Sequence, residues 1–392
     1  LESRFPWFEW GVPNPKELAY FRRAPSLPMK TLAARQCLVP KTKKTPRVIV
    51  IEPTSLQYMQ QALLRSLVTN LERYSSFVGF TDQEINRQMA REGSVQKNLA
   101  TIDLSEASDR VSYLQAAAVF GRFSNTWEAL DATRSSEVSL VDGGETITIN
   151  KFASMGSAVC FPVEAVTFAT AIFLAIQRHH RKTNPRFRLT RSFIRSMEGK
   201  VRVYGDDIVV PVAYLSDVYS LFSQLGWKVN SRKSFHESSF RESCGGEYWD
   251  GEDITPVRAR ARFATNIRQI DEVQSMVSFR NQLYMRGLWA SCQFLDSRLE
   301  RVLKGLFPII GETSPGLGRT SVSFKPLWLR TDRYQRALTR GYVVRTRIPR
   351  NESSDIGKLL KCLIAPGLDD QHLYRSGRPS DASIHRGWIP AA

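Results

Sequence analysis

The stretch RVYGDDIVVPV, residues 202–212, places two adjacent aspartates, Asp206 and Asp207, after Gly205 in an otherwise apolar run. Val203 alternates with polar residues and IVVPV follows the acidic pair, which predicts a strand, a tight turn and a returning strand. Adjacent carboxylates in apolar surroundings repel each other and are costly to desolvate, and a bound divalent cation relieves both effects. A solvated Asp-Asp turn is the alternative reading of so short a motif.

A second carboxylate site precedes this stretch in the chain. Residues 100–112, ATIDLSEASDRVS, end an apolar strand in Asp103, and Asp109 follows further on. If the two strands are neighbours, Asp103 comes close to Asp206 and Asp207. Three such carboxylates can hold two Mg²⁺ ions roughly 4 Å apart, with Mn²⁺ as a substitute, which is the arrangement for in-line phosphoryl transfer. We therefore predict that these three aspartates are metal ligands and catalytic residues.

The composition favours a polyanionic partner. The 392 residues carry a formal net charge of +17, more than solubility requires, which favours nucleic acid over an anionic membrane. A hydrophobic fraction of 42% is typical of a globular chain. The five cysteines are scattered and lack any CxxC spacing, so we expect free thiols in a reducing compartment rather than a disulfide framework or a zinc site.

One segment, residues 157–177, is apolar enough to suggest a membrane span. Pro162 and Glu164 interrupt it, and a helix that is apolar on nearly every side is more often buried in a large core. We therefore expect a soluble protein with no membrane partner. The chain begins with Leu1 rather than Met, as a fragment or a processed product does.

Local patterns predict mixed α/β structure in the middle of the chain and mostly helical structure towards its end. A capping box, Thr81 with Glu84, starts one expected helix and Gly93 ends it. Gly287 is expected to separate the last two helices. The expected elements are helices over 14–23, 57–74, 81–93 and 157–177, a basic loop running into a strand over 37–53, a strand over 98–105, a hairpin over 140–150, and two helices over 271–305.

Five stretches resemble motifs of viral RNA-dependent RNA polymerases, in order along the chain. They are most similar to the replicase β subunit of single-stranded RNA bacteriophages, the levivirus or Qβ type. The acidic stretches correspond to motifs A and C of the polymerase palm. The five are VPKTKKTPRVIVIEP (39–53), REGSVQKNLATIDLSEASD (91–109), ASMGSAVCFPVEAVTFAT (153–170), VYGDDIVVP (203–211) and FRESCGGEYWDGEDITP (240–256).

The resemblance implies roles for further residues in the nucleotide site. Asp109 matches the second motif A aspartate, which helps to recognise the ribose 2′-hydroxyl, and it argues against a reverse transcriptase. Ser154 and Gly156 match the motif B loop, which contacts the template and the incoming ribose. Many related polymerases place Asn where this chain has Glu164, so Glu164 receives no such role.

Basic residues are expected to bind phosphates. The basic loop resembles motif F, in which Lys41, Lys43, Lys44 and Arg47 would meet the triphosphate, although a solvated loop is the alternative. Lys233 matches the motif D lysine proposed as the general acid for pyrophosphate. Residues 319–350 hold nine Lys and Arg against one acidic residue, with Trp328 and Tyr334 interleaved. The RNA-binding residues that we predict are Arg258, Arg260, Arg262, Lys325, Arg330 and Arg333.

The resemblance implies a right-hand polymerase of the α/β (α+β) class. Fingers elements would occupy 1–100, the palm with a fingers insertion near 113–152 would occupy 101–250, and a mostly helical thumb with a basic C-terminal region would occupy 251–392. Its function would be template-directed RNA synthesis from ribonucleoside triphosphates with Mg²⁺, copying a phage RNA genome in the bacterial cytoplasm. Partners would be template and product RNA, host translation elongation factors and a ribosomal protein. The alternatives are a reverse transcriptase, a capsidless-virus RNA polymerase, or an inactive palm that only binds RNA.

Overall fold

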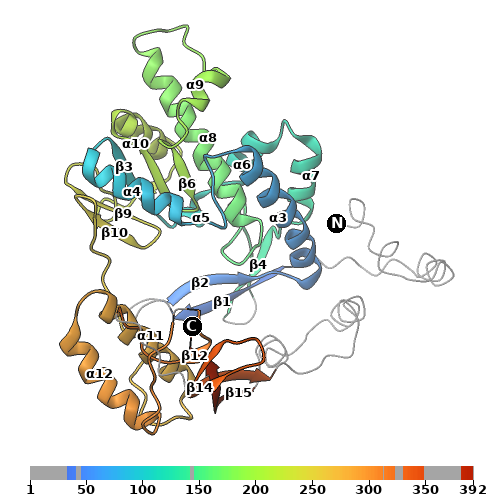
Figure 1. Ribbon diagram of the computed structural model, residues 1–392. Helices are drawn as coiled ribbons and strands as arrows, with labels where there is room; N and C mark the ends of the chain where they lie inside the picture. The colour runs from blue at the N-terminus through green and yellow to red at the C-terminus, as the bar shows by residue number, and fades with distance from the viewer. Residues whose placement is uncertain are drawn as a thin grey trace, which may run out of the picture. The chain divides into compact units, whose positions relative to one another are not determined.

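The computed structural model describes residues 33–40, 46–141, 145–311, 313–322, 330–347 and 381–391. The chain divides into two compact units, Leu1–Thr255 and Pro256–Ala392, here called unit 1 and unit 2 (Figure 1). The helix that we predicted over 14–23 lies outside the described residues.

The centre of unit 1 is an antiparallel sheet in the order β6-β7-β3-β8. Its register runs from Leu99 opposite Pro211 to Asp103 opposite Asp207. The strand over 98–105 and the strand, turn and strand over 202–212 are thereby confirmed. The strands are β3 (Leu99–Ser105), β6 (Arg202–Tyr204), β7 (Asp207–Pro211) and β8 (Lys228–Val229).

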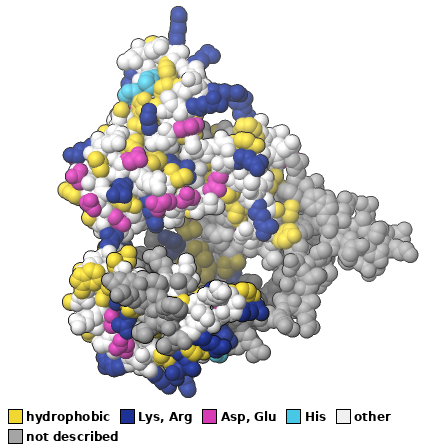
Figure 2. Space-filling model, viewed as in Figure 1, with side chains coloured by type: hydrophobic (Ala, Val, Ile, Leu, Met, Phe, Trp, Pro, Cys, Tyr) yellow, Lys and Arg dark blue, Asp and Glu magenta, His cyan; other side chains and the backbone are white. Residues whose placement is uncertain are grey.

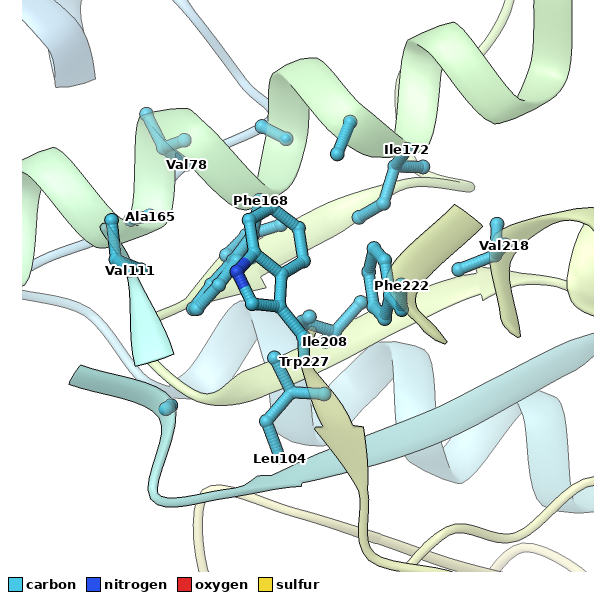
Figure 3. Close-up of a cluster of buried hydrophobic side chains, with 14 of the residues drawn as sticks. Val78, Leu104, Val111, Ala165, Phe168, Ile172, Ile208, Val218, Phe222 and Trp227 are labelled. Carbon is cyan, nitrogen blue, oxygen red and sulfur yellow. The ribbon is translucent and has the colours of Figure 1, made fainter. Parts of the chain in front are cut away.

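Side-chain alternation divides this sheet into two faces. Ile102 and Leu104 of β3 join Ile208 of β7 in the main core. On the other face, Leu99 and Val209 pack against Met89 of helix α4 (Glu84–Gln96). The main core lies against α8 (Cys160–Arg181) and α10 (Leu215–Gln224). Figure 3 shows its aromatic centre, where the rings of Phe168 and Phe222 contact the indole of Trp227 at centroid distances of 4.8 and 5.2 Å.

Helix α8 corresponds to the apolar segment that we predicted over 157–177. By length and composition alone it could cross a membrane, and it is the one such helix among the described residues. In the structure, 67% of its most apolar window is buried, because it packs beside α3, α6 and α10 in unit 1 (Figure 1). The expectation of a buried helix is confirmed.

Further elements of unit 1 surround the sheet. A second sheet, in the order β2-β1-β4-β5, carries the strand that leads on from the basic loop, and residues 37–40 of the predicted loop are themselves part of a strand. The helices are α3 (Thr54–Tyr74), α4 (Glu84–Gln96), α5 (Ala107–Arg110), α6 (Tyr113–Phe120), α7 (Ser124–Ala132) and α9 (Arg191–Arg195), with a 3₁₀ turn over Val212–Tyr214. The remaining strands are β1 (Ala34–Pro40), β2 (Pro46–Ile51), β4 (Glu137–Ser139), β5 (Thr146–Thr148), β9 (Phe240–Ser243), β10 (Gly246–Trp249) and β11 (Glu252–Asp253).

The capping box that we predicted for α4 is wrong. The helix begins at Glu84 without a side-chain cap, because the Thr81 hydroxyl donates to the carboxylate of Glu72 on α3 instead. Gly93 does not end the helix either. It lies inside α4, where an added Cβ would be 3.1 Å from the carbonyl oxygen of Leu99, so its smallness allows β3 to approach.

The described residues of unit 2 form two helices and a sheet. The break predicted at Gly287 is confirmed, since this residue has φ 72° between α11 (Ile270–Met285) and α12 (Trp289–Val302). The expectation of a mostly helical C-terminal region is wrong, because a four-stranded sheet follows the helices. Its strands are β12 (Gly316–Leu317), β13 (Arg330–Thr331), β14 (Ala337–Arg347) and β15 (Asp381–Pro390).

Candidate active site

The acidic turn between β6 and β7 depends on Gly205. This residue has φ 60°, which glycine adopts without the steric cost that other residues meet. A Cβ at this position would lie 2.3 Å from Cε2 of Phe161 on α8, so the turn packs directly on that ring. Asp206 follows at the exposed tip, and Asp207 begins the returning strand.

Asp103 and Asp207 lie directly opposite each other on neighbouring antiparallel strands. Their β3 and β7 neighbours Ile102 and Ile208 point into the main core, so alternation directs both aspartates to the other face of the sheet. Residues in this relation have Cβ atoms roughly 5 Å apart, and like charges there destabilise the strand pair. The sheet therefore brings together two carboxylates that repel each other.

The carboxylate of Asp103 is oriented by the segment that follows β8. The side-chain amide of Asn230 donates to its Oδ2 at 2.8 Å, and the Asp103 backbone N–H donates to the Ser234 hydroxyl at 3.2 Å. Lys233 Nζ lies 4.0 Å from Asp103 Oδ1 and is 60% exposed. The structure thus brings the predicted lysine near a predicted metal ligand, while Asn230 makes the shorter contact.

The carboxylate of Asp207 meets the tip of the β9–β10 hairpin. The turn residues Cys244 and Gly245 have φ 49° and 72°, the left-handed pair of a two-residue hairpin. Cys244 donates to Asp207 from both its backbone N–H and its thiol. Burial nevertheless raises the pKa of Asp207 to about 6, because it outweighs the Cys244 backbone hydrogen bond, and repulsion from Asp206 and other acids adds to the shift.

Two more acidic residues lie near this turn. Asp109 forms an ion pair with Lys151, with Asp109 Oδ1 2.5 Å from Lys151 Nζ. Glu164, on α8, is 7% exposed and its Oε2 has no hydrogen-bond partner. Burial, with smaller contributions from the negative charges of Asp206 and Asp109, raises the pKa of Glu164 to about 8. Glu164 is therefore a neutral acid at neutral pH.

The loop at 154–156 is held closely against β2. Gly156 has φ 118°, and a Cβ there would lie 2.0 Å from the carbonyl oxygen of Val50. The Val50 N–H donates to the Met155 carbonyl at 2.8 Å. Ser154 is buried, and its hydroxyl has no hydrogen-bond partner in the described part of the chain. No residue other than glycine fits at 156, so the shape of this loop depends on it.

Gln60 on α3 anchors the residues that follow this loop. It is fully buried, and its Oε1 accepts from the Ser157 hydroxyl and the Ala158 N–H, both at 3.0 Å. Its Nε2 donates to the Thr133 carbonyl at 2.8 Å. No sequence motif pointed to Gln60, Asn230 or the Cys244 contact, because each partner lies far away in the chain.

The predicted phosphate and RNA contacts fall in different places. Arg47 is exposed on β2 in unit 1. The predicted residues Lys41, Lys43, Lys44 and Lys325, together with Trp328, lie outside the described residues. The arginines predicted to bind RNA are exposed in unit 2, namely Arg258, Arg260, Arg262, Arg330 and Arg333.

The acidic side chains at the β6–β7 turn are the donors available for the predicted Mg²⁺. Within the described residues, no group of three or more His, Cys, Asp or Glu side chains forms a ready-made metal site. The paired carboxylates of Asp103 and Asp207, with Asp206 beside them, still fit Mg²⁺, which uses one or two carboxylates and completes its shell with water and substrate phosphates.

The fold and this site define a class of protein before any family is considered. The structure is similar to that of the RNA-dependent RNA polymerase of a human picorbirnavirus, with a TM-score of 0.50 and 14% identity over 70% of this chain and 58% of that chain. At this identity the similarity concerns the fold alone. The class is thus a mixed α/β fold of the viral RNA polymerase kind.

The family follows from the sequence comparison. The family model described as RNA replicase, beta-chain, matches residues 29–293, and this chain belongs to that family. It is 34% identical over 230 residues to the RNA-directed RNA polymerase subunit beta of Escherichia virus Qbeta, covering 58% of this chain and 35% of that protein. It is 31% identical over 264 residues to the RNA-directed RNA polymerase beta chain of Escherichia phage MS2, covering 67% of this chain and 43% of that protein. The chain therefore spans less than half the length of these curated relatives.

Proposed function

We propose that this chain carries the polymerase centre of an RNA phage replicase, which synthesises RNA from ribonucleoside triphosphates on an RNA template. The observation that carries the proposal is the placement of Asp103 opposite Asp207, next to the exposed Asp206. A strand pair that retains like charges at this position is less stable than one that does not, which favours a role in binding a cation. The family to which the chain belongs supports the same reaction.

The three aspartates would hold Mg²⁺, which on binding neutralises the triphosphate and activates the attacking 3′-hydroxyl. Asn230 keeps the Asp103 carboxylate in one orientation, and Cys244 does the same for Asp207. Lys233 lies within reach of this group of acids and would protonate the departing pyrophosphate.

The nucleotide would be recognised beside the acidic turn. Asp109 would accept a hydrogen bond from the ribose 2′-hydroxyl, with Lys151 holding its carboxylate in place. Ser154 and Gly156 would shape the surface against which the incoming nucleotide and the template lie. Arg47 would contact the triphosphate together with Lys41, Lys43 and Lys44.

The parts of a right-hand polymerase would follow one another along the chain. Residues 1–100 would supply fingers elements, 101–250 the palm and 251–392 a thumb with the RNA-binding arginines and Lys325. The template would be a phage RNA genome in the cytoplasm of a bacterial host. Host translation elongation factors and a ribosomal protein would be partners of the whole replicase.

Two other functions make different predictions about substrate. A reverse transcriptase would incorporate deoxyribonucleotides, and an inactive palm would bind RNA without synthesis. We expect incorporation of labelled ribonucleotides that depends on a single-stranded RNA template and matches its complement. Preferential incorporation of deoxyribonucleotides would overturn the proposal in favour of the first alternative, and RNA binding without incorporation, with host extract added, would favour the second.

A further inference from the structure

Trp388, on β15 of unit 2, lies under two arginine side chains from the same sheet, one on the adjacent strand β14 and one on β13, which pairs with β14. The guanidinium carbon of Arg340 is 5.0 Å from the indole centroid, and that of Arg330 is 5.9 Å from it. The side chain is 37% exposed, although tryptophan buries a large apolar area when it can. The motifs read from the sequence assigned no role to Trp388 or Arg340.

The strand register explains this cluster. Arg340 of β14 lies directly opposite Trp388 of β15, and Arg330 of β13 lies opposite Leu338, two residues before Arg340. Residues two apart share a face of a sheet, so all three side chains emerge on one face at the same end. Towards the other end that face is covered, since Tyr342 is buried in the core of unit 2.

A second aromatic residue nearby in the chain has the same kind of neighbours. Tyr334, in the turn between β13 and β14, is 64% exposed. The guanidinium carbons of Arg333 and Arg336 lie 4.6 and 5.4 Å from its ring centroid. Each of the two rings contacts two arginines and still remains exposed. Burial of apolar surface therefore does not explain these contacts.

The charge of this region favours a polyanion. Residues 330–347 and 381–391 contain seven arginines and two aspartates. Asp332, one of these aspartates, is already engaged by the side chain of Arg336 at 2.8 Å. Figure 2 shows dark blue basic side chains gathered along the lower rim of unit 2. Arginines neutralise backbone phosphates, while aromatic rings and guanidinium planes offer surfaces on which unpaired bases stack.

We propose that Trp388 with Arg330 and Arg340 forms a stacking site for a base of single-stranded RNA, outside the candidate active site. The arginines extend the flat surface of the indole and contact the flanking phosphates, and Tyr334 offers a second platform. This inference rests on the proposed function, because it takes the RNA substrate from there. It adds stacking to the phosphate contacts that were predicted for Arg330 and Arg333.

The test separates stacking from charge. The full chain is titrated with a short fluorescent oligoadenylate and with an abasic ribose-phosphate strand of equal length. Trp388→Ala is expected to weaken oligoadenylate binding about tenfold, since one base stacked on an aromatic ring contributes this much, and to leave abasic-strand binding within about twofold. Trp388→Phe, which retains a ring, is expected to keep most of the affinity. Arg340→Ala is expected to weaken binding of both strands.

Trp289→Ala is the matched control. This tryptophan is also in unit 2 and is 56% exposed, but among the described residues no guanidinium lies over its ring, so no loss is expected. A variant that fails to fold would lose binding of both the oligoadenylate and the abasic strand, which separates misfolding from loss of stacking.

Three results would overturn the inference. Equal oligoadenylate binding by the parent and Trp388→Ala would remove the stacking site, and template-dependent synthesis by the parent would show that the proposed function stands without it. If Trp388→Ala weakened the binding of both strands equally, without a change in melting temperature, base stacking on Trp388 would also be excluded. A parent chain that neither binds RNA nor synthesises it would remove the inference and the proposed function together.

Discussion

Single residues at the candidate active site are held in states that are unfavourable for them alone. Asp207 faces Asp103 across a strand pair, and Glu164 is a buried acid with an unpaired oxygen. Gly205 occupies a left-handed conformation against an aromatic ring. Local features of this kind collect at functional sites, where the surrounding fold compensates for their cost.

The turn at Gly205 gives a direct test of this strain. We expect Gly205→Ala to lower the free energy of unfolding by about 3 kcal/mol, because the left-handed conformation costs about 1 kcal/mol and the clash with Phe161 adds the cost of overpacking. Gly226→Ala is the control, since Gly226 has φ 79° but nothing within 4 Å of the added Cβ. Urea denaturation measures both, and equal losses would contradict the account of the turn.

Glu164 predicts a pH dependence of stability. Its folded-state pKa, about 8, is raised above the ordinary value of 4.5, so its contribution to stability is complete below pH 4.5 and is lost as the pH rises to about 8. The loss approaches 1.4 kcal/mol per pH unit within this window. Glu164→Gln removes the titration.

Melting temperatures of the two proteins should therefore agree near pH 4.5 and diverge up to pH 8, with the Glu164→Gln variant the more stable at high pH. A constant difference across this range would contradict a raised pKa for Glu164.

At the scale of elements, the β9–β10 hairpin connects the acidic site to α4. Arg87 of α4 donates to the Cys244 carbonyl at 3.2 and 3.0 Å, and Cys244 donates to Asp207 in turn. The tip of the hairpin is thereby held by Arg87 on one side and by Asp207 on the other. This chain of contacts gives β9 and β10 a role in orienting a carboxylate that they do not carry.

Removing the thiol donor should weaken cation binding. We expect Cys244→Ala to reduce the affinity for Mn²⁺ about fivefold, because a hydrogen bond to a carboxylate is lost while the backbone donor remains. Cys244→Ser supplies a hydroxyl donor and should stay within about twofold of the parent. Electron paramagnetic resonance of free Mn²⁺ measures binding without any activity, and unchanged affinity in Cys244→Ala would exclude this role.

Local patterns predicted the elements whose own residues determine them. Strand β3 follows from the apolar run that ends in Asp103, the β6–β7 hairpin follows from the alternation before Gly205, and α8 follows from its length and apolar composition. The capping box failed because a distant partner, Glu72, competes for Thr81. Strands β14 and β15 were missed because arginines interrupt the apolar pattern of β14 and because the two strands pair across a long separation in sequence.

In the candidate site, too, the sequence predicted the residues that lie in local motifs but not their distant partners. Asp103, Asp206 and Asp207 were singled out because motif and alternation place them, and the structure does bring the first and the last together. Asn230, Gln60 and Cys244 were not singled out, because only the tertiary fold brings them to their partners.

At the scale of the whole molecule, the net charge of +17 predicts salt-dependent RNA binding. Each phosphate contact to a single strand should add about −0.7 to the slope of log affinity against log salt concentration. Arg333→Ala, at an exposed predicted contact, should reduce the magnitude of that slope by about one such step. Fluorescence titrations over a salt series measure it, and an affinity independent of salt would contradict electrostatic binding.

We propose that the acidic turn of unit 1 is the catalytic centre of an RNA polymerase. The most direct measurement is incorporation of labelled ribonucleotides on a single-stranded RNA template with Mg²⁺, in the presence and absence of host extract, by the chain and by its Asp206→Asn variant. We expect template-dependent product from the parent and a loss of at least about a hundredfold in the variant, because Asn removes an anionic ligand while preserving the shape of the turn. Equal synthesis by both proteins would show that these carboxylates do not carry the reaction.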